Sequence, residues 1–256
     1  MPNHHVWYEL ITSDHDAAEA FYTKVVGWRF TDSGVPGMRY SILHAGERPI
    51  GGLMTMEGGP RHAWYGYVGV DDVDAFAGKA KAAGGSVHKE PEDIPGVGRF
   101  AYVADPQGAA FVLFKGNGTP DPEPLPFMAP GSCGWHELHS SDAAAGFDFY
   151  AGLFGWSKDE ALDMGPMGTY QLFRTDRDGA AGGMMTDAAN GPIWVYYFVT
   201  DEIEAAKARV LDAGGQVIHG PMEVPGGAWV LNGIDPQGAM FALVAPPKGW
   251  SNDAQA

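Results

Sequence analysis

The sequence predicts an α+β protein made of four βαβββ modules, arranged as two tandem copies of one domain. The segment Trp7-Tyr8-Glu9-Leu10 returns as Trp135-His136-Glu137-Leu138, and Asp105-Pro106-Gln107-Gly108 returns as Asp235-Pro236-Gln237-Gly238. Within each copy, a strand pattern, a helix pattern and three further strand patterns occur in this order twice. The repeat is as long as a whole domain and far longer than a solenoid unit, so it indicates duplication of a domain.

The elements of the first copy follow from local patterns. Asp14 is placed to cap a helix whose apolar residues recur at helical spacing, and Gly27 is placed to end it. Asp71 or Asp72 is placed to cap a second helix that closes at Gly84-Gly85. The turn at 105–108 suits a type I turn, with Pro second and Gly fourth. The predicted strands lie at or near 6–11, 28–30, 40–44, 50–54, 64–70, 87, 100–103 and 111–114.

The predicted domains are 1–116 and 132–256, joined by a Pro- and Gly-rich linker at 117–131. The 256 residues include 16 Lys and Arg against 32 Asp and Glu, for a net charge of −16. Such a surface repels phosphate backbones and anionic lipids, so neither nucleic acid nor a membrane is an expected partner. No segment approaches the ~20 apolar residues of a membrane helix, and the expected location is the cytoplasm. A monomer with pseudo-symmetric domains and a homodimer both remain open.

Three motifs, each present in both halves, carry a family resemblance: Asp14 followed by Phe21-Tyr22 and Gly27-Trp28, the Ala83-Gly84-Gly85 ending, and the Asp-Pro-Gln-Gly turn. With this alternation of elements, the chain resembles the vicinal oxygen chelate superfamily, which includes glyoxalase I, bleomycin-resistance proteins and extradiol dioxygenases. It is most similar to the tandem glyoxalase-like members. The resemblance implies paired modules whose curved sheets surround a ligand cavity, with helices outside.

The same resemblance implies a divalent metal held by His or Gln and Glu side chains from four strands. We expect no metal and no other cofactor, because three of the four mapped positions in each half lack a suitable donor. For the same reason a dioxygenase is not expected. The residues at these positions are Trp7, Tyr65 and Val112 in the first half and Trp135, Val195 and Ala242 in the second.

Strand parity predicts which residues face the cavity, because alternate residues of a strand point to the same side. The expected ligand-binding residues are aromatic and come from both halves: Trp7, Tyr40, Tyr65, Tyr67, Trp135, Tyr170 and Tyr197. Trp64 and Trp194 have the opposite parity and are assigned to the core.

The candidate catalytic residues are Glu9, Glu137 and His139. A carboxylate on a strand between aromatic and apolar neighbours requires a partner or a raised pKa, which would suit a general base or a ligand anchor. A structural role, in which each Glu accepts hydrogen bonds from the backbone or from water, remains open. His139 has no twin, because Ile11 occupies its place, and it forms a Glu-x-His pair with Glu137.

The sequence therefore predicts a tandem protein that binds a small, partly aromatic organic ligand in one or both of its metal-independent cavities. The alternative is a lyase or isomerase of glyoxalase type, with or without a non-standard metal site. In that enzyme Glu137 or Glu9 would be the general base, and His139 and nearby tyrosines would stabilise the enolate.

Overall fold

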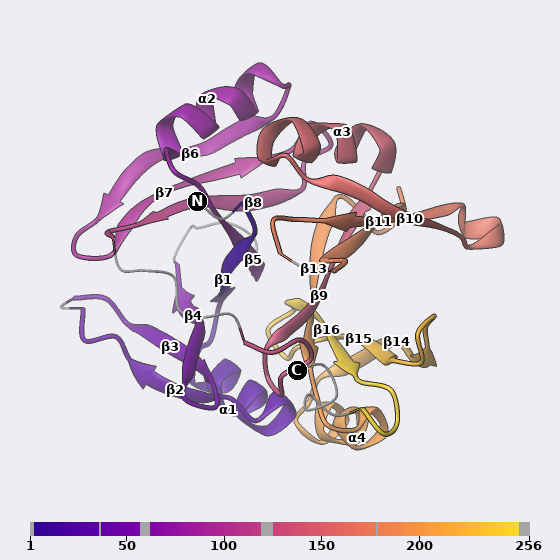
Figure 1. Ribbon diagram of the computed structural model, residues 1–256. Coiled ribbons are helices and arrows are strands. Elements are labelled where there is room, and N and C mark those ends of the chain that lie inside the picture. Colours follow the sequence, from indigo (N-terminus) through magenta and orange to yellow (C-terminus); the bar gives the residue numbers. More distant parts are fainter. Residues whose placement is uncertain (1–2, 36, 57–61, 119–124, 178, 251–256) are drawn as a thin grey trace. The chain divides into compact units, whose positions relative to one another are not determined.

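The computed structural model describes residues 3–35, 37–56, 62–118, 125–177 and 179–250. The predicted α+β class and the four βαβββ modules are confirmed (Figure 1). Residues 119–124 of the predicted linker lie outside the described residues. No helix in the described ranges has the length and apolar character needed to cross a membrane.

The first half of the sequence contains two of the modules. Their elements are β1 (His5–Thr12), α1 (His15–Val26), β2 (Arg29–Asp32), β3 (Tyr40–Ala45), β4 (Arg48–Thr55), β5 (Ala63–Gly69), α2 (Val73–Ala82), β6 (Ser86–Ile94), β7 (Gly98–Ala104) and β8 (Ala110–Gly116). The second half repeats this order with one short 3-10 turn added. Its elements are β9 (Cys133–Ser140), α3 (Ala143–Phe154), β10 (Ser157–Asp163), η1 (Gly165–Met167), β11 (Thr169–Arg174), β12 (Gly182–Thr186), β13 (Ile193–Val199), α4 (Ile203–Asp212), β14 (Gln216–Glu223), β15 (Trp229–Ile234) and β16 (Met240–Ala245).

The predicted helix ends agree with the structure. The Asp14 carboxylate accepts a hydrogen bond from the backbone N–H of Ala17, which starts α1. Gly27 ends this helix in the left-handed conformation, with a φ of +86°. Asp72 is the cap of α2, and this settles the choice between the two adjacent aspartates.

The strands belong to two open, curved eight-stranded sheets, one from each half of the sequence. In the first module the strand order is β2-β3-β4-β1, and β1 and β4 run parallel. The third module has the matching order β10-β11-β12-β9, again with a parallel β9–β12 pair. In each of these modules, the first and third strands of the module therefore lie on either side of its fourth strand. This order decides the geometry of the site described below.

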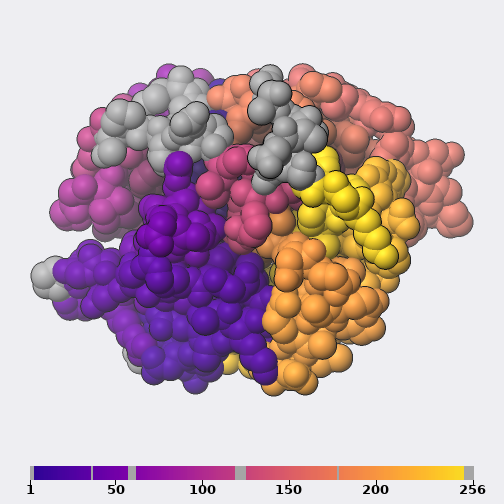
Figure 2. Space-filling model, turned by 60° about the horizontal axis from the view of Figure 1, so that its bottom comes forward, coloured from indigo at the N-terminus to yellow at the C-terminus, as the bar shows by residue number. Residues whose placement is uncertain are grey.

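The chain forms two compact units, and each combines segments from both halves of the sequence. One unit comprises Met1–Val6, Tyr65–Pro122 and His136–Val195, and the other comprises Trp7–Trp64, Glu123–Trp135 and Tyr196–Ala256. Helix α2 packs against α3 in the first of these units, and α1 packs against α4 in the second. The indigo surface of the α1 module and the orange surface of the α4 module meet in Figure 2. The predicted domains 1–116 and 132–256 follow the repeat in the sequence, whereas the two compact units follow the packing of the chain.

In each unit, a buried hydrogen-bonded chain links a segment from the first half of the sequence to a segment from the second half. The Trp64 indole donates to the Tyr22 hydroxyl at 2.9 Å, and Tyr22 donates to the Asp235 carboxylate at 3.0 Å. Asp235 belongs to the repeated Asp-Pro-Gln-Gly turn, and its other oxygen accepts from the backbone N–H groups of that turn. Trp64 is 5% exposed, so its predicted place in the core is confirmed.

The other unit contains the equivalent chain. The Trp194 indole donates to the Tyr150 hydroxyl at 2.8 Å, and Tyr150 donates to the Asp105 carboxylate at 3.1 Å. Trp194 is 3% exposed and is also in the core, as its parity predicts. Each helix tyrosine therefore contacts an aspartate that the opposite half of the sequence supplies.

Candidate functional site

Three of the predicted site residues in the first module come together through hydrogen bonds. The Tyr40 hydroxyl, on β3, donates to Oε2 of Glu9, on β1, over 3.1 Å. The same hydroxyl accepts a hydrogen bond from the Trp7 indole over 3.1 Å. Glu9 is only 4% exposed, so its carboxylate is held in a largely dehydrated position by a tyrosine and beside an indole.

A glycine in the intervening strand makes this contact possible. Strand β4 lies between β3 and β1, and its Gly52 is the register partner of Glu9. A Cβ atom at this position would overlap the ring and hydroxyl of Tyr40. The absence of a side chain at Gly52 therefore lets the tyrosine cross β4 and reach the carboxylate on β1.

The third module repeats this arrangement at the equivalent positions. The Tyr170 hydroxyl, on β11, donates to Oε2 of Glu137, on β9, over 2.7 Å. Gly183 of β12 is the register partner of Glu137, and a Cβ atom there would overlap the Tyr170 ring. A Glu–Gly–Tyr set across three strands is therefore the common feature of the two candidate sites.

His139 adds a second contact to the carboxylate in the third module. Its Nε2 lies 2.7 Å from Oε1 of Glu137, so the predicted Glu-x-His pair does share one strand face. Its Nδ1 lies 3.0 Å from Oδ2 of Asp187, which follows β12. Burial lowers the pKa of His139, but the hydrogen bonds and negative charges of Glu137 and Asp187 outweigh burial and leave the pKa raised.

Asp187 and Asn190 also belong to this cluster, and none of the sequence motifs described above includes them. The Asn190 amide donates to Oδ2 of Asp187 over 2.8 Å, and this bond is the main cause of the lowered pKa of Asp187. A comparison of the two halves of the sequence indicates Asp187. Strand register aligns Ile11 with Met54 and His139 with Met185, so the counterpart of Asp187 in the first half is Met56.

The other predicted ligand-binding residues have different neighbours. Tyr65 and Tyr67 are buried, and their rings meet those of Tyr102 and Phe114, each at 5.8 Å between centroids. The buried Tyr197 hydroxyl accepts a hydrogen bond from Asn232 at 3.3 Å. Trp135 is half-buried on β9, and its carbonyl accepts from the Cys133 thiol. None of these contacts tests a role in ligand binding.

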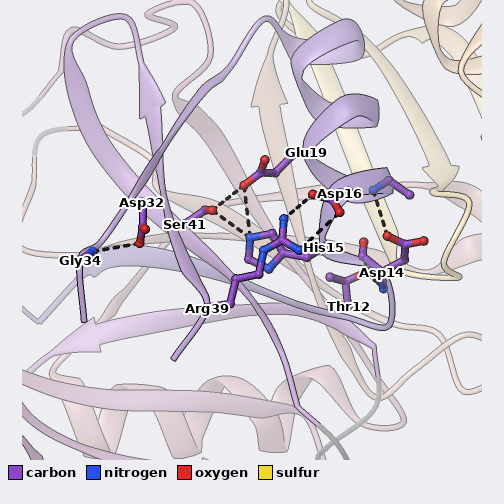
Figure 3. Close-up of polar contacts among 10 residues, drawn as sticks. Thr12, Asp14, His15, Asp16, Glu19, Asp32, Gly34, Arg39 and Ser41 are labelled. Carbon is purple, nitrogen blue, oxygen red and sulfur yellow. Dashed lines mark hydrogen bonds and ion pairs between the residues drawn. The ribbon is translucent and has the colours of Figure 1, made fainter. Parts of the chain in front are cut away.

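A second polar network lies between α1 and β3, next to Tyr40 in the chain (Figure 3). His15 Nε2 is 2.8 Å from the Ser41 hydroxyl and 3.2 Å from the Glu19 carboxylate, and Ser41 also donates to Glu19. Both contacts use the same imidazole nitrogen and Ser41 is 7% exposed, so this is not the geometry of an activated nucleophile. With the Arg39–Asp16 ion pair, the network fixes the start of β3, from which Tyr40 projects.

The residues present do not fit the metal that the fold family implies. The mapped positions offer indole, phenol and aliphatic groups, and the Trp7 indole nitrogen already donates to Tyr40. In the third module, both His139 nitrogens face carboxylates, so neither has a lone pair directed at a shared ion. Within the described part of the chain, no three His, Cys, Asp and Glu side chains form a group that could hold a metal.

The chain is similar to several known proteins over nearly its whole length. It is 31% identical to CFP32 of Mycobacterium bovis over 248 residues, covering 94% of each chain. It is 30% identical to the anthracycline biosynthesis protein DnrV of Streptomyces peucetius, covering 97% of this chain and 95% of that protein. Lactoylglutathione lyase GLX1 of Arabidopsis thaliana is 28% identical over 130 residues, or 46% of this chain and 45% of that protein.

Solved structures and a family sequence model agree on the fold. The Mn(II)-bound glyoxalase of Novosphingobium aromaticivorans superposes with a TM-score of 0.65 at 19% identity, covering 97% of this chain and 83% of that chain. At this identity the superposition shows the fold alone. The model of the glyoxalase/bleomycin resistance protein/dioxygenase superfamily matches residues 4–113 and again residues 134–243. Two matches that together span most of the sequence show that this chain is a tandem member of the glyoxalase/bleomycin resistance protein/dioxygenase superfamily.

Proposed function

We propose that this protein binds a small, partly aromatic organic ligand at its two Glu–Gly–Tyr sites, without a metal. One observation carries the proposal: both halves direct a tyrosine hydroxyl across a glycine onto a strand carboxylate, at Glu9 and at Glu137. A carboxylate held in place by a phenol is a ready hydrogen-bond acceptor for a ligand hydroxyl or amine.

The aromatic part of the ligand is inferred from the side chains around these carboxylates. Trp7 and Tyr40 form a hydrogen-bonded pair beside Glu9, and flat rings stack favourably on such side chains. The full-length similarity to a protein of anthracycline biosynthesis supports the same class, since anthracyclines carry a flat fused-ring system. No metal is part of the proposal, because the mapped ligand positions carry side chains that bind metals poorly.

The direct test is isothermal titration calorimetry of the whole chain with an anthracycline, after treatment with a chelator. We expect two binding sites per chain. Glu9→Gln and Glu137→Gln should each weaken one of them by roughly tenfold or more, as expected when a hydrogen bond to a charged group is lost. Glu47→Gln is the matched control, because the Glu47 side chain is 97% exposed and lies outside both sites. Unchanged affinity in both site variants would refute the assignment.

A lyase or isomerase of glyoxalase type is the second candidate, and the contact of His139 with Glu137 favours it. In that reaction Glu137 would take a proton from the carbon next to a carbonyl, and Tyr170 would donate a hydrogen bond nearby. The substrate to test is the hemithioacetal of methylglyoxal and glutathione, with thioester formation followed by absorbance. Glu137→Gln should abolish turnover in an enzyme, whereas a binding protein should show no turnover in the wild type.

A further inference from the structure

The imidazole of His139 lies between two carboxylates and contacts both. Nε2 is 2.7 Å from Glu137 and Nδ1 is 3.0 Å from Asp187. A neutral imidazole has a single N–H, and ionised carboxylates only accept hydrogen bonds. With both carboxylates ionised, the two contacts are satisfied together only when both ring nitrogens carry a proton, as in an imidazolium cation.

The surroundings support this charge state. Among the described residues, the charged groups that contact the imidazole are Glu137 on its own strand and Asp187 after β12, and the ionisable Tyr170 contacts Glu137. The two carboxylates raise the pKa of His139 against the effect of burial. The adjacent residues of β12 are Met184, Met185 and Thr186, and β13 carries no charged side chain. The side chains of the cluster keep some exposure, 12% for Glu137 and His139 and 18% for Asp187. The cluster is therefore mostly buried but keeps some contact with solvent.

The first-half site lacks this cation. Ile11 stands where the second half has His139, and Met56 stands where it has Asp187. Glu9 instead has Tyr40 as the end of a neutral Trp–Tyr hydrogen-bonded chain. The two sites share their Glu–Gly–Tyr core and differ in the polar groups that extend from it.

We infer that the second-half site binds the protonated amine of its ligand, and that His139 is a resident cation whose charge this amine replaces. The inference rests on the proposed function and names the polar end of the ligand at that site. Like the imidazolium, a ligand ammonium group carries one positive charge and more than one N–H donor. It can therefore donate hydrogen bonds to Glu137 and Asp187 in place of His139. Placing both cations together would add like-charge repulsion, so binding of one favours loss of the other charge.

The proton balance of this exchange is simple. When the ligand ammonium reaches the carboxylates, one N–H bond of the His139 imidazolium breaks and the electron pair stays on the ring nitrogen. The proton passes to the buffer base, and no bond of the ligand changes. Binding should therefore release up to one proton per ligand where free His139 is protonated, and affinity should rise with pH by up to about tenfold per pH unit.

The experiment uses the full chain carrying Glu9→Gln, so that the second-half site dominates binding. The probes are an anthraquinone with a 2-aminoethyl side arm and the matched 2-hydroxyethyl compound, which carries no charge. Titration calorimetry near pH 6.5, in buffers with different ionisation enthalpies, measures the protons released. We expect proton release with the amine alone, and at least tenfold tighter binding of the amine than of the alcohol at pH 8.

The variants separate the role of His139 from general damage to the site. His139→Gln should bind the amine without releasing a proton and with little dependence on pH. Asp187→Asn removes one of the two carboxylates that raise the His139 pKa, so proton release should move to lower pH. His88→Gln is the control, because His88 is an exposed histidine on β6.

The outcomes distinguish this inference from the proposed function. Equal binding of the amine and the alcohol, with no proton release in the parent protein, would overturn the inference and leave ligand binding intact. Proton release that persists in His139→Gln would also overturn it. Failure of both probes and of the anthracycline to bind the unsubstituted chain would instead refute the proposed function.

Discussion

Replacing Tyr22 with phenylalanine tests whether the hydrogen-bonded link between the first and last modules stabilises the protein. Tyr22 is fully buried on α1, accepts a hydrogen bond from Trp64, and donates to Asp235, which lies 213 positions further along the chain. The substitution removes one hydroxyl and keeps the ring. It leaves the Asp235 carboxylate without its side-chain donor and the Trp64 indole without its acceptor.

The expected destabilisation follows from these two losses. A hydrogen bond to a charged group contributes roughly 1.5–3 kcal/mol, and a buried N–H left without an acceptor costs about 1–3 kcal/mol. Partial relaxation gives an expected loss of about 2–4 kcal/mol in the free energy of unfolding. For a protein of this size, that corresponds to a fall of roughly 5–15 °C in Tm. Burial already raises the pKa of Asp235, and loss of the Tyr22 donor should raise this pKa further.

The assay is urea and thermal unfolding followed by circular dichroism at pH 7. Tyr150→Phe is the matched variant in the other unit, where Tyr150 links Trp194 to Asp105, and it should cost a similar amount. Met167→Leu at a 56% exposed position is the control and should change stability by less than about 0.5 kcal/mol. If Tyr22→Phe is as stable as the control while circular dichroism shows a native fold, the hydrogen-bonded link between the first and last modules does not stabilise the protein.

Three further predictions concern pH and local geometry. Burial lowers the pKa of His136 to about 4, so the folded state disfavours protonation of this imidazole. The free energy of unfolding should therefore fall by about 3 kcal/mol as pH drops from about 6.5 to 4, which urea unfolding measures. His136→Gln should remove most of that loss. Gly52→Ala should displace Tyr40 from Glu9 and weaken first-half binding alone, and Gly183→Ala should do the same at Glu137, both followed by calorimetry. His15→Ala should lower Tm by a few degrees and weaken only the first-half site, because Ala143 and Gln171 replace His15 and Ser41 in the second half.

The local structure could be predicted from the sequence because it depends on neighbouring residues. Asp14 and Gly27 mark the ends of α1 through capping and a left-handed φ, and both features belong to a few residues. Strand parity placed Glu137 and His139 on one face, because alternation along a strand is a property of the backbone. The roles assigned to these side chains in binding or catalysis stay predictions.

The pairing of modules could not be predicted in the same way. Each half of the sequence contains a complete set of elements, and nothing in the local pattern states that α1 packs against α4. That choice depends on contacts such as Tyr22 with Asp235, which only the assembled chain reveals. The glycines at 52 and 183 carried a signal that was not used: glycine inside a strand often marks a close approach by another group, here a tyrosine ring.

The difference between the two sites follows from which contacts the duplication could change without loss of the fold. Replacing Gly52 or Gly183 would push a tyrosine into its neighbours, so the Glu–Gly–Tyr core tolerates little variation in either half. Positions 11 and 139 each lie two residues after the site glutamate on the same strand. The first half has Ile11 together with Met56, and the second half has His139 in contact with Asp187. The two halves therefore differ at the groups where the polar end of the proposed ligand would bind. The two Glu–Gly–Tyr sets therefore differ in the groups next to the carboxylate, and the paired amine and alcohol probes test the consequence of that difference at the second-half set.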